Sequence, residues 1–249
     1  MVLERRNPKM FKKRTTKPET GNKYYNTVVK GGYSTTIIGS PTDPGCNVLA
    51  NCVGYSAGRF NENIGADKFV YYTYPPNAED FFSSGKAQKL KTGVIPDLGA
   101  ICVWSKGKAG VPGDGAGHVA NIEEIYSDGS ILTSESGWGC KNPFWTNHRE
   151  FGSGNLGAGS EYHFLGFVYL PDEHRSKTEG MPIIKEGSTG DSVRWLQLAL
   201  IQNGYLRKNE LDGDFGLVTL GALLAYQLKH GLEVDGICGP MTWNSLRMG

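Results

Sequence analysis

The chain has 249 residues, of which 39% are hydrophobic and 20% are charged, a balance typical of a globular protein with one large domain or two modest ones. The formal net charge is +1, so the overall charge indicates no partner. The sequence has no run of about 18 apolar residues, which excludes a membrane-spanning helix.

The first 20 residues form a strongly basic arm. The first 18 of them hold Arg5, Arg6, Lys9, Lys12, Lys13, Arg14 and Lys17 against the single acid Glu4. Such an arm can be attracted to a polyanion, such as nucleic acid, an acidic wall polymer or a membrane surface. The alternative is a solvated N-terminal segment. We favour the solvated segment, and expect no nucleic-acid partner and no membrane insertion.

The cysteines and the N-terminus indicate the compartment. No apolar core follows the N-terminal positive charges, so the segment is unlike a Sec signal peptide. The cysteines are odd in number, scattered and without a C-x-x-C pair, as in a reducing compartment: Cys46, Cys52, Cys102, Cys140 and Cys238. We therefore expect synthesis in a cytoplasm. Cysteine and histidine do not cluster as zinc ligands do, so we expect no metal and no cofactor.

Residues 20–171 alternate short apolar stretches with turns, and the first clear element is a helix beginning near Cys52. Asp128-Gly129 favours a tight hairpin between two of the strands that follow. Strands are expected at residues 99–104, 118–126, 130–134 and 162–170. The pattern predicts an α+β fold with an antiparallel sheet.

Residues 172–181 are polar, lack apolar periodicity and predict a linker between a first domain, 1–171, and a second, 182–249. Helical patterns follow the linker. The first has its apolar face at Val193, Leu196, Leu200 and Ile201, with Asp191 or Ser192 as N-cap and Gly204 at its end. The second runs from 217 to 229 and is ended by His230-Gly231.

An internal repeat lies in the second domain. The pattern D-G-x-x-G-x-x-T occurs at residues 212–219 and again at 235–242. Each copy predicts a glycine-rich turn that leads into a helix, because aspartate bonds nearby amides and glycine permits left-handed backbone. Cys238 aligns with Phe215, so we expect Cys238 in the core.

Residues 183–246 resemble the bacterial peptidoglycan-binding domain with a three-helix core. The resemblance rests on Gly187–Asp191, Leu196-Gln197, Gly204-Tyr205, both repeat copies and Gly231–Asp235. It implies a module that binds cell-wall peptidoglycan. Aromatic side chains that could stack on sugars, each with a place in the core as the alternative, are Trp195, Tyr205, Tyr226 and Trp243.

Cys52 is the strongest nucleophile candidate. Cys102 lies in a continuous apolar strand and Cys238 aligns with a core residue, so both should be inert. Cys140 stays possible. A helix-compatible segment directly follows Cys52, and the amides of a helix N-terminus stabilise a thiolate. The small residues of 54–58 would let this weak helix pack close to a sheet.

A thiolate needs a base, and His118 is the best candidate because it opens a strand after a flexible glycine-rich segment. Antiparallel pairing through Asp128-Gly129 would bring Glu135, at the end of the next strand, beside His118. A carboxylate there would orient the base. His148 and His163 are alternatives, although the alternating strand around His163 is typical of a structural residue.

The order Cys52, Gly117-His118-Val119 and Glu135 resembles the CHAP family (cysteine, histidine-dependent amidohydrolases/peptidases) over roughly residues 30–171. Further matches are Tyr55, Gly58-Arg59, Pro96, Gly99–Ile101, Trp104 and Asp128-Gly129. The resemblance implies a papain-like α+β fold that cleaves amide bonds of peptidoglycan. It also implies that Cys52 is the nucleophile, His118 the general base and acid, and Glu135 the residue that orients His118.

The chain departs from the family pattern in two places. Many relatives carry glutamine before the nucleophile as an oxyanion donor, and here Asn51 would share that role with the Cys52 N–H. Gly137 stands where many relatives carry asparagine. Some relatives bind calcium through an acidic loop before the nucleophile. Here residues 42–45 contain one acidic residue, Asp43, so we predict no calcium site. Trp138, Phe144 and Trp145 are candidates for the substrate cleft, with core positions as the alternative.

The pairing of a catalytic and a wall-binding domain resembles a bacteriophage endolysin, an antimicrobial enzyme of cytolysis. This implies synthesis in the host cytoplasm, release through a holin pore and action on the wall as a monomer. The bond cleaved would be that of an N-acetylmuramoyl-L-alanine amidase or of a stem or cross-bridge endopeptidase. The alternatives are a bacterial autolysin of the same chemistry and a non-catalytic wall-binding or tail-associated protein.

Overall fold

A computed structural model shows the arrangement of the chain. It describes residues 11–19, 22, 24–25, 29–30, 33–34, 51–65, 77–87, 89–107, 117–137, 142–152, 154–175 and 180–248. The predictions made for Cys46, Cys140, Trp138 and the loop around Asp43 lie outside these residues. No helix in the described part of the chain combines the length and apolar character needed to cross a membrane.

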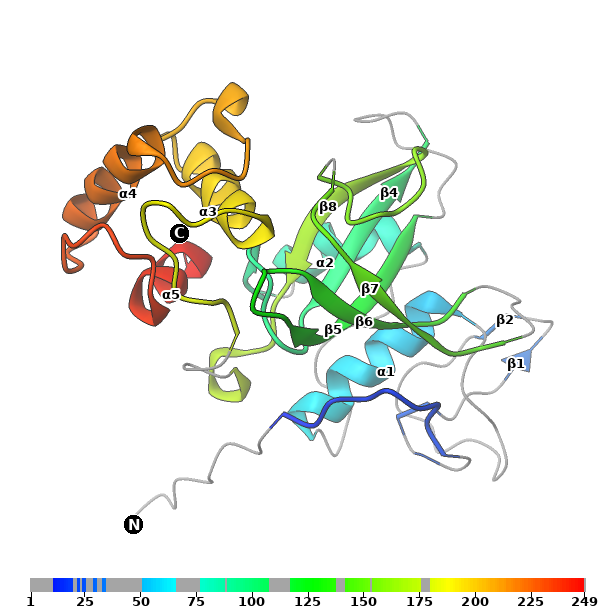
Figure 1. Ribbon diagram of the computed structural model, residues 1–249. Coiled ribbons are helices and arrows are strands. Elements are labelled where there is room, and N and C mark those ends of the chain that lie inside the picture. The colour runs from blue at the N-terminus through cyan, green and yellow to red at the C-terminus, as the bar shows by residue number, and fades with distance from the viewer. Residues whose placement is uncertain are drawn as a thin grey trace, which may run out of the picture.

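An antiparallel sheet of six strands forms the centre of the first domain (Figure 1). In spatial order its strands are β3 (Thr92–Gly93), β8 (Tyr162–Val168), β4 (Ile101–Lys106), β5 (His118–Ile125), β6 (Ile131–Glu135) and β7 (Trp145–Arg149). Two short strands pair apart from it, β1 (Val29–Lys30) and β2 (Tyr33–Ser34). The predicted α+β fold with an antiparallel sheet is confirmed.

The tight hairpin predicted between β5 and β6 is observed. Beyond the ladder pair of Ile125 with Ile131, the Tyr126 N–H donates to the Ser130 carbonyl at 2.9 Å. The turn is closed by the Gly129 N–H, which donates to the Tyr126 carbonyl at 2.9 Å. Gly129 has a φ of 91°, a conformation that glycine adopts without strain.

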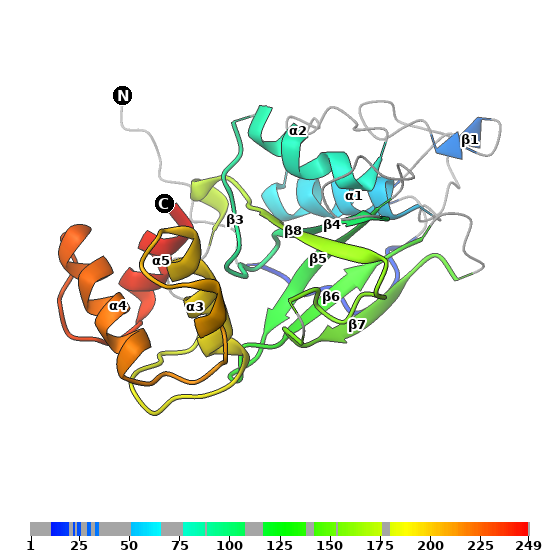
Figure 2. The same cartoon turned by 90° about the horizontal axis from the view of Figure 1, so that it is seen from above.

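Two helices cover one face of the sheet (Figure 2). They are α1 (Cys52–Ile64) and α2 (Phe81–Ala87), the second preceded by a 3-10 turn at Ala78–Asp80. Val53, Ala57 and Phe60 share one face of α1 and pack with Val103 and Val119 of the sheet. These apolar contacts fix the start of α1 above the sheet.

Gly58 of α1 makes room for the N-terminal segment rather than for the sheet. A Cβ at this position would collide with the Tyr24 carbonyl and touch the Tyr25 ring. The small residues of 54–58 were expected to bring the helix close to the sheet. At Gly58, the close approach is instead to residues 24–25.

The described part of the basic arm, residues 11–19, is held by the first domain. Arg14 Nη2 lies 2.5 Å from Glu62 Oε1, and Lys13 Nζ lies 2.7 Å from Glu124 Oε2. Arg59 Nη2 donates to the Lys12 carbonyl at 2.6 Å. The expectation of a solvated segment holds for Lys13, which is exposed, and is wrong for Arg14, whose charge is bound by the Glu62 carboxylate of α1.

The second domain contains three helices, as predicted: α3 (Asp191–Gln202), α4 (Leu217–Lys229) and α5 (Pro240–Met248). Gly204 has a φ of 78° two residues after α3, which confirms its place at the helix end. The predicted N-cap was wrong. Gly190 occupies that position, and the Asp191 carboxylate instead accepts from Arg194 and from the Phe151 N–H.

Both copies of the repeat are held by a buried glutamine in the same way. Gln197 Nε2 donates to Asp212 Oδ1 at 2.7 Å, and its Oε1 accepts from the Gly213 N–H at 2.8 Å. Gln227 makes the equivalent bonds to Asp235 Oδ1 and the Gly236 N–H, at 2.9 and 3.0 Å. The repeat thus folds as two equivalent turns, and Cys238, like Phe215, is fully buried.

Trp195 of α3 joins the two domains. Its Nε1 donates to the Gly129 carbonyl at 2.9 Å, and its ring meets the Phe151 ring edge-on at 4.7 Å between centroids. The Ser192 N–H also donates to the Asp128 carbonyl at 3.0 Å. The apolar core of the second domain is therefore continuous with the core on the face of the sheet opposite α1.

Three of the four aromatic residues predicted to bind the wall are core residues instead. Trp195 and Trp243 are 1% exposed and Tyr226 is fully buried. A sugar ring stacks only on an aromatic face that it can reach, so the prediction is wrong for these three residues. Tyr205 is partly exposed and lies 5.4 Å from the Tyr226 ring centroid. It stays a prediction.

Candidate active site

Cys52 is the first residue of α1, and Asn51 is its N-cap. The Asn51 Oδ1 accepts from the Val53 N–H at 2.9 Å and from the Gly54 N–H at 3.4 Å. The Asn51 N–H in turn donates to Ser136 Oγ, which follows β6, at 3.1 Å. The cap satisfies first-turn amides and fixes the half-buried Cys52 at the positive end of the helix.

His118 and Glu135 meet on the sheet below α1. His118 opens β5 and Glu135 ends β6, and the antiparallel ladder between these strands brings them together. His118 Nε2 lies 2.9 Å from Glu135 Oε2. The structure thus makes the contact that the hairpin argument predicted.

Charge stabilises the protonated form of His118. Burial acts against the charged ring, but hydrogen bonds to the Cys52 thiol and to Glu135 outweigh it and raise the pKa of His118 to about 9. Burial also opposes ionisation of Glu135, yet the bond to His118 and the charge of Arg149 lower its pKa to about 2. The site therefore holds a carboxylate and an imidazolium that both act on the region around Cys52.

The His118 ring is fixed by aromatic neighbours. Trp104, its partner across the β4–β5 ladder, lies 5.8 Å away between ring centroids, and Tyr162 lies 6.5 Å away. Since Nε2 faces Glu135, Nδ1 is the ring nitrogen that remains for the Cys52 thiol. This orientation suits proton transfer between the thiol and the ring.

Arg149 is a neighbour of this site that the sequence did not single out. It lies at the end of β7 opposite Ile131, and its side chain reaches along β6 to the Glu135 carboxylate. The sequence around an arginine in a strand does not indicate which acidic residue it will contact. The strand order β5-β6-β7, which no local pattern encodes, produces the contact.

The other candidate bases and nucleophiles lie elsewhere. His148 Nε2 forms a hydrogen bond with Ser130 Oγ at 2.9 Å, and His163 Nε2 donates to the Gly107 carbonyl at 2.6 Å. Cys102 and Cys238 are fully buried, and burial raises the pKa of both thiols. Among the described residues, no group of three or more His, Cys, Asp or Glu side chains is arranged to hold a metal ion.

The aromatic cleft candidates differ in position. Trp145 is partly exposed and pairs directly with Glu135 across the β6–β7 ladder, so it lies near the site and stays a cleft candidate. Phe144 is a core residue, because it is 8% exposed and packs edge-on against Tyr55 at 5.7 Å between centroids.

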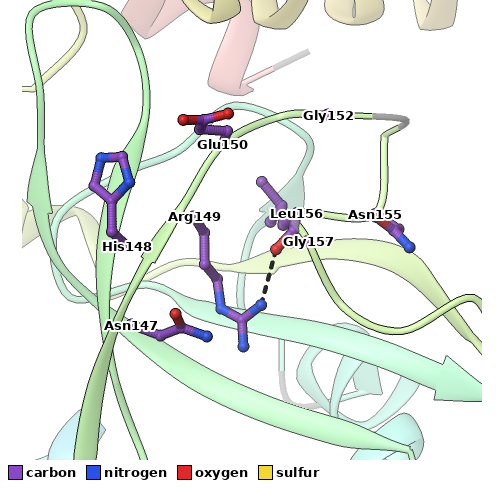
Figure 3. Close-up of a pocket in the computed structure, with 8 residues that line it drawn as sticks. All are labelled: Asn147, His148, Arg149, Glu150, Gly152, Asn155, Leu156 and Gly157. Carbon is purple, nitrogen blue, oxygen red and sulfur yellow. Dashed lines mark hydrogen bonds between the residues drawn. The ribbon is translucent and has the colours of Figure 1, made fainter.

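A polar pocket of about 320 Å³ lies beside β7 and the loop after it (Figure 3). It is lined by Asn147, His148, Arg149, Glu150, Gly152, Asn155, Leu156 and Gly157. Neither Cys52 nor His118 lines it. Figure 3 shows the Arg149 guanidinium pointing away from His148 and Glu150, toward the Leu156 carbonyl. The pocket is therefore separate from the candidate nucleophile.

Comparison with known proteins finds two domains. Residues 42–137 match the family model of the CHAP domain, and residues 189–246 match that of a peptidoglycan binding domain. The chain therefore contains a CHAP domain and a peptidoglycan-binding domain, which confirms both sequence resemblances.

Individual relatives match over short stretches. N-acetylmuramoyl-L-alanine amidase CwlM of Mycobacterium tuberculosis is 49% identical over 57 residues, 23% of this chain and 14% of that protein. A spore cortex-lytic enzyme of Halalkalibacterium halodurans is 45% identical over 58 residues, 23% of this chain and 17% of that protein. The chain thus spans less than a fifth of either relative.

A solved structure, that of an N-acetylmuramoyl-L-alanine amidase from Staphylococcus aureus, shares 20% sequence identity with this chain. The match covers 53% of this chain and 33% of the other, with a TM-score of 0.37.

Proposed function

Because the chain contains a CHAP domain and a peptidoglycan-binding domain, we propose that it is a peptidoglycan hydrolase that cleaves an amide bond by cysteine catalysis. The observation that carries this proposal is the alignment of Cys52, His118 and Glu135. Cys52 stands at a capped helix N-terminus, it contributes to the raised pKa of His118, and His118 is held by the carboxylate of Glu135.

The first step forms an acyl-enzyme. His118 holds the proton that it has taken from the Cys52 thiol, and the resulting thiolate attacks the carbonyl carbon of the amide. The negative charge that develops on the carbonyl oxygen is stabilised by the Cys52 N–H and by the amide group of Asn51. The imidazolium of His118 then protonates the leaving nitrogen, the C–N bond breaks, and a thioester to Cys52 remains.

The second step releases the acyl group. His118, neutral after it has protonated the leaving group, takes a proton from water, and the resulting hydroxide attacks the thioester carbonyl. The C–S bond breaks, the carboxylic acid leaves, and the pair of Cys52 thiolate and His118 imidazolium is restored. Throughout both steps, Glu135 holds the ring orientation and stabilises each imidazolium that forms.

The substrate would be the peptide part of bacterial peptidoglycan, held near the site by the second domain. The same constellation serves an N-acetylmuramoyl-L-alanine amidase or a stem or cross-bridge endopeptidase. Mass spectrometry of digested walls separates them: an amidase frees the lactyl carboxyl of the muramic acid, whereas an endopeptidase creates new termini within or between peptide stems.

The direct test compares two cysteine variants on purified cell walls. Cys52→Ala should abolish the loss of turbidity, and Cys238→Ala, which removes a buried thiol of the second domain, should retain it. Circular dichroism would verify that both variants are folded. Lysis by the Cys52→Ala variant would exclude cysteine catalysis and favour the alternative of a different catalytic group.

We also propose, from the domain pairing alone, that the enzyme acts in bacteriophage-type cytolysis. In this role it would be made in the host cytoplasm, pass through a holin pore and act on the wall as a monomer. A bacterial autolysin of the same chemistry is the alternative. Induction in bacteria with and without a co-expressed holin tests the route, since holin-dependent lysis is expected.

A further inference from the structure

The Glu135 carboxylate has a second charged partner besides His118. Arg149 Nε donates to Glu135 Oε1 at 2.9 Å, and Arg149 Nη2 donates to Oε2 at 2.9 Å. Both side chains are buried, at 6% and 1% exposure. Two parallel bonds from a planar guanidinium fix both the position and the plane of a carboxylate.

Arg149 is itself fixed from two other sides. Its Nη1 donates to the Leu156 carbonyl at 2.8 Å (Figure 3), and its guanidinium lies 4.9 Å from the ring centroid of Trp104. Trp104 Nε1 bonds the neighbouring Asn155 carbonyl at 2.9 Å. A guanidinium so constrained has little freedom, so it can serve as a rigid support for Glu135.

Glu135 Oε2 is shared between the two cations, since it accepts from Arg149 Nη2 and lies 2.9 Å from His118 Nε2. The position of this one oxygen therefore sets the direction of the bond to the histidine ring. We propose that Arg149 is a positioning residue of the hydrolase, which keeps Glu135 ionised and aimed at His118. This inference deepens the proposed function and rests on it.

The charged and titratable groups around Glu135 come from four elements. His118 faces it from β5 and Arg149 from β7, Cys102 lies nearby on β4 as a buried neutral thiol, and Cys52 of α1 acts on it through His118. Without Arg149, one cation would remain to oppose the cost of burying the carboxylate. Glu135 would then protonate at a higher pH, and a neutral acid supports an imidazolium poorly.

The test follows the alkylation of Cys52 by iodoacetamide as a function of pH, read from the Cys52 peptide by mass spectrometry. Only the thiolate reacts, so the alkylation rate rises with pH as the Cys52 thiol ionises. We call this rise the acid limb. Its midpoint pH reports the support that Glu135 gives to His118, because the imidazolium stabilises the thiolate. In Arg149→Met, this limb should move upward by about one pH unit or more. An unmoved limb, or one that moves downward, would overturn the proposal.

Arg149→Lys separates charge from geometry and covers the case in which Arg149→Met does not fold. Lysine keeps the positive charge but lacks the planar guanidinium that donates two parallel hydrogen bonds. The acid limb should therefore stay near that of the wild type. The rate of wall lysis at saturating wall should nonetheless fall roughly tenfold, because the carboxylate is no longer held in its plane. A wild-type rate in this variant would contradict a positioning role.

Arg175→Gln is the matched control. Arg175 also forms a buried pair, with its Nε 2.6 Å from Asp97 Oδ2, so its loss should lower stability without moving the alkylation limb. The labelling experiment does not require wall hydrolysis. If the wild type fails to lyse walls, the proposed function fails while the alkylation limb still decides the role of Arg149.

Discussion

At the scale of single residues, the protonation of His118 links the candidate site to stability. The pKa of His118 is raised from 6.5 to about 9, because bonds to Cys52 and Glu135 outweigh the effect of burial. The folded protein thus holds the His118 proton more tightly than the unfolded chain. This contribution to the free energy of unfolding is complete below about pH 6.5 and is lost as the pH rises through about 9.

We therefore expect the stabilising effect of His118 to disappear in alkaline solution. The melting temperature of the wild type should exceed that of His118→Gln at pH 6.5, and the difference should shrink as the pH approaches 9. Differential scanning calorimetry of both proteins over this range measures it. A difference that grows with pH would mean that the ring is not held as an imidazolium.

Asn51 combines two roles that substitution can separate. Its carbonyl oxygen caps α1, whereas the amide group is the proposed oxyanion donor. Asn51→Ser keeps a good cap and loses the amide, so stability should stay within about 0.5 kcal/mol of the wild type while wall lysis falls roughly a hundredfold. Asn51→Ala should in addition lose about 1 kcal/mol of unfolding free energy.

Urea unfolding and turbidity assays measure the two effects. Full lytic activity in Asn51→Ser would show that the amide makes no contribution to the oxyanion. The sequence resemblance predicted the oxyanion role of Asn51, whereas its N-cap role became evident only in the structure, because the exact first residue of a helix is hard to place from sequence.

At the scale of elements, sequence patterns predicted what local chemistry decides. The helix over 217–229 was predicted at its observed bounds, because its apolar spacing and the following glycine both mark it. The N-cap of α3 was missed because Asp191 turns its carboxylate toward Phe151 in the other domain. That contact depends on how the domains pack, so the local preference of aspartate for caps was overridden.

Because the two repeat turns are held in the same way, substitution of either buried glutamine should lower the free energy of unfolding by a similar amount. Gln197→Leu and Gln227→Leu would each leave buried groups of one turn unpaired, and each should lower the free energy of unfolding by about 1–3 kcal/mol. Gln202→Leu, at an exposed position of α3, is the control and should change it little. Equal stability in all three variants, measured by urea unfolding, would show that the glutamine bonds do not stabilise the turns.

At the scale of the whole molecule, the sequence predicted two domains and a linker but no contact between the domains, and the described residues form a shared core. Apolar periodicity in α3 indicated that Trp195 lies on a buried face, but not that this face would contact the sheet of the first domain. Similarly, the charge of Lys13 and Arg14 was evident, and their acidic partners on α1 and β5 were not. Long-range pairing of this kind follows from topology rather than from local pattern.

The shared core predicts that the two domains unfold together. Trp195 packs against Phe151 and Phe167 and bonds the Gly129 carbonyl, so Trp195→Ala should cost about 3–5 kcal/mol and split one calorimetric transition into two. Trp145→Ala, at a partly exposed position of the first domain, should leave a single transition. Two transitions in the wild type would contradict the shared core.

The central claim is that Cys52, activated by His118, is the nucleophile of a wall hydrolase. The most direct measurement treats the protein with limiting iodoacetamide and follows both wall lysis and the labelled cysteine peptides. Cys52 should be labelled first, and the lost fraction of lytic activity should equal the labelled fraction of Cys52. Lysis that persists when Cys52 is fully alkylated would contradict the account.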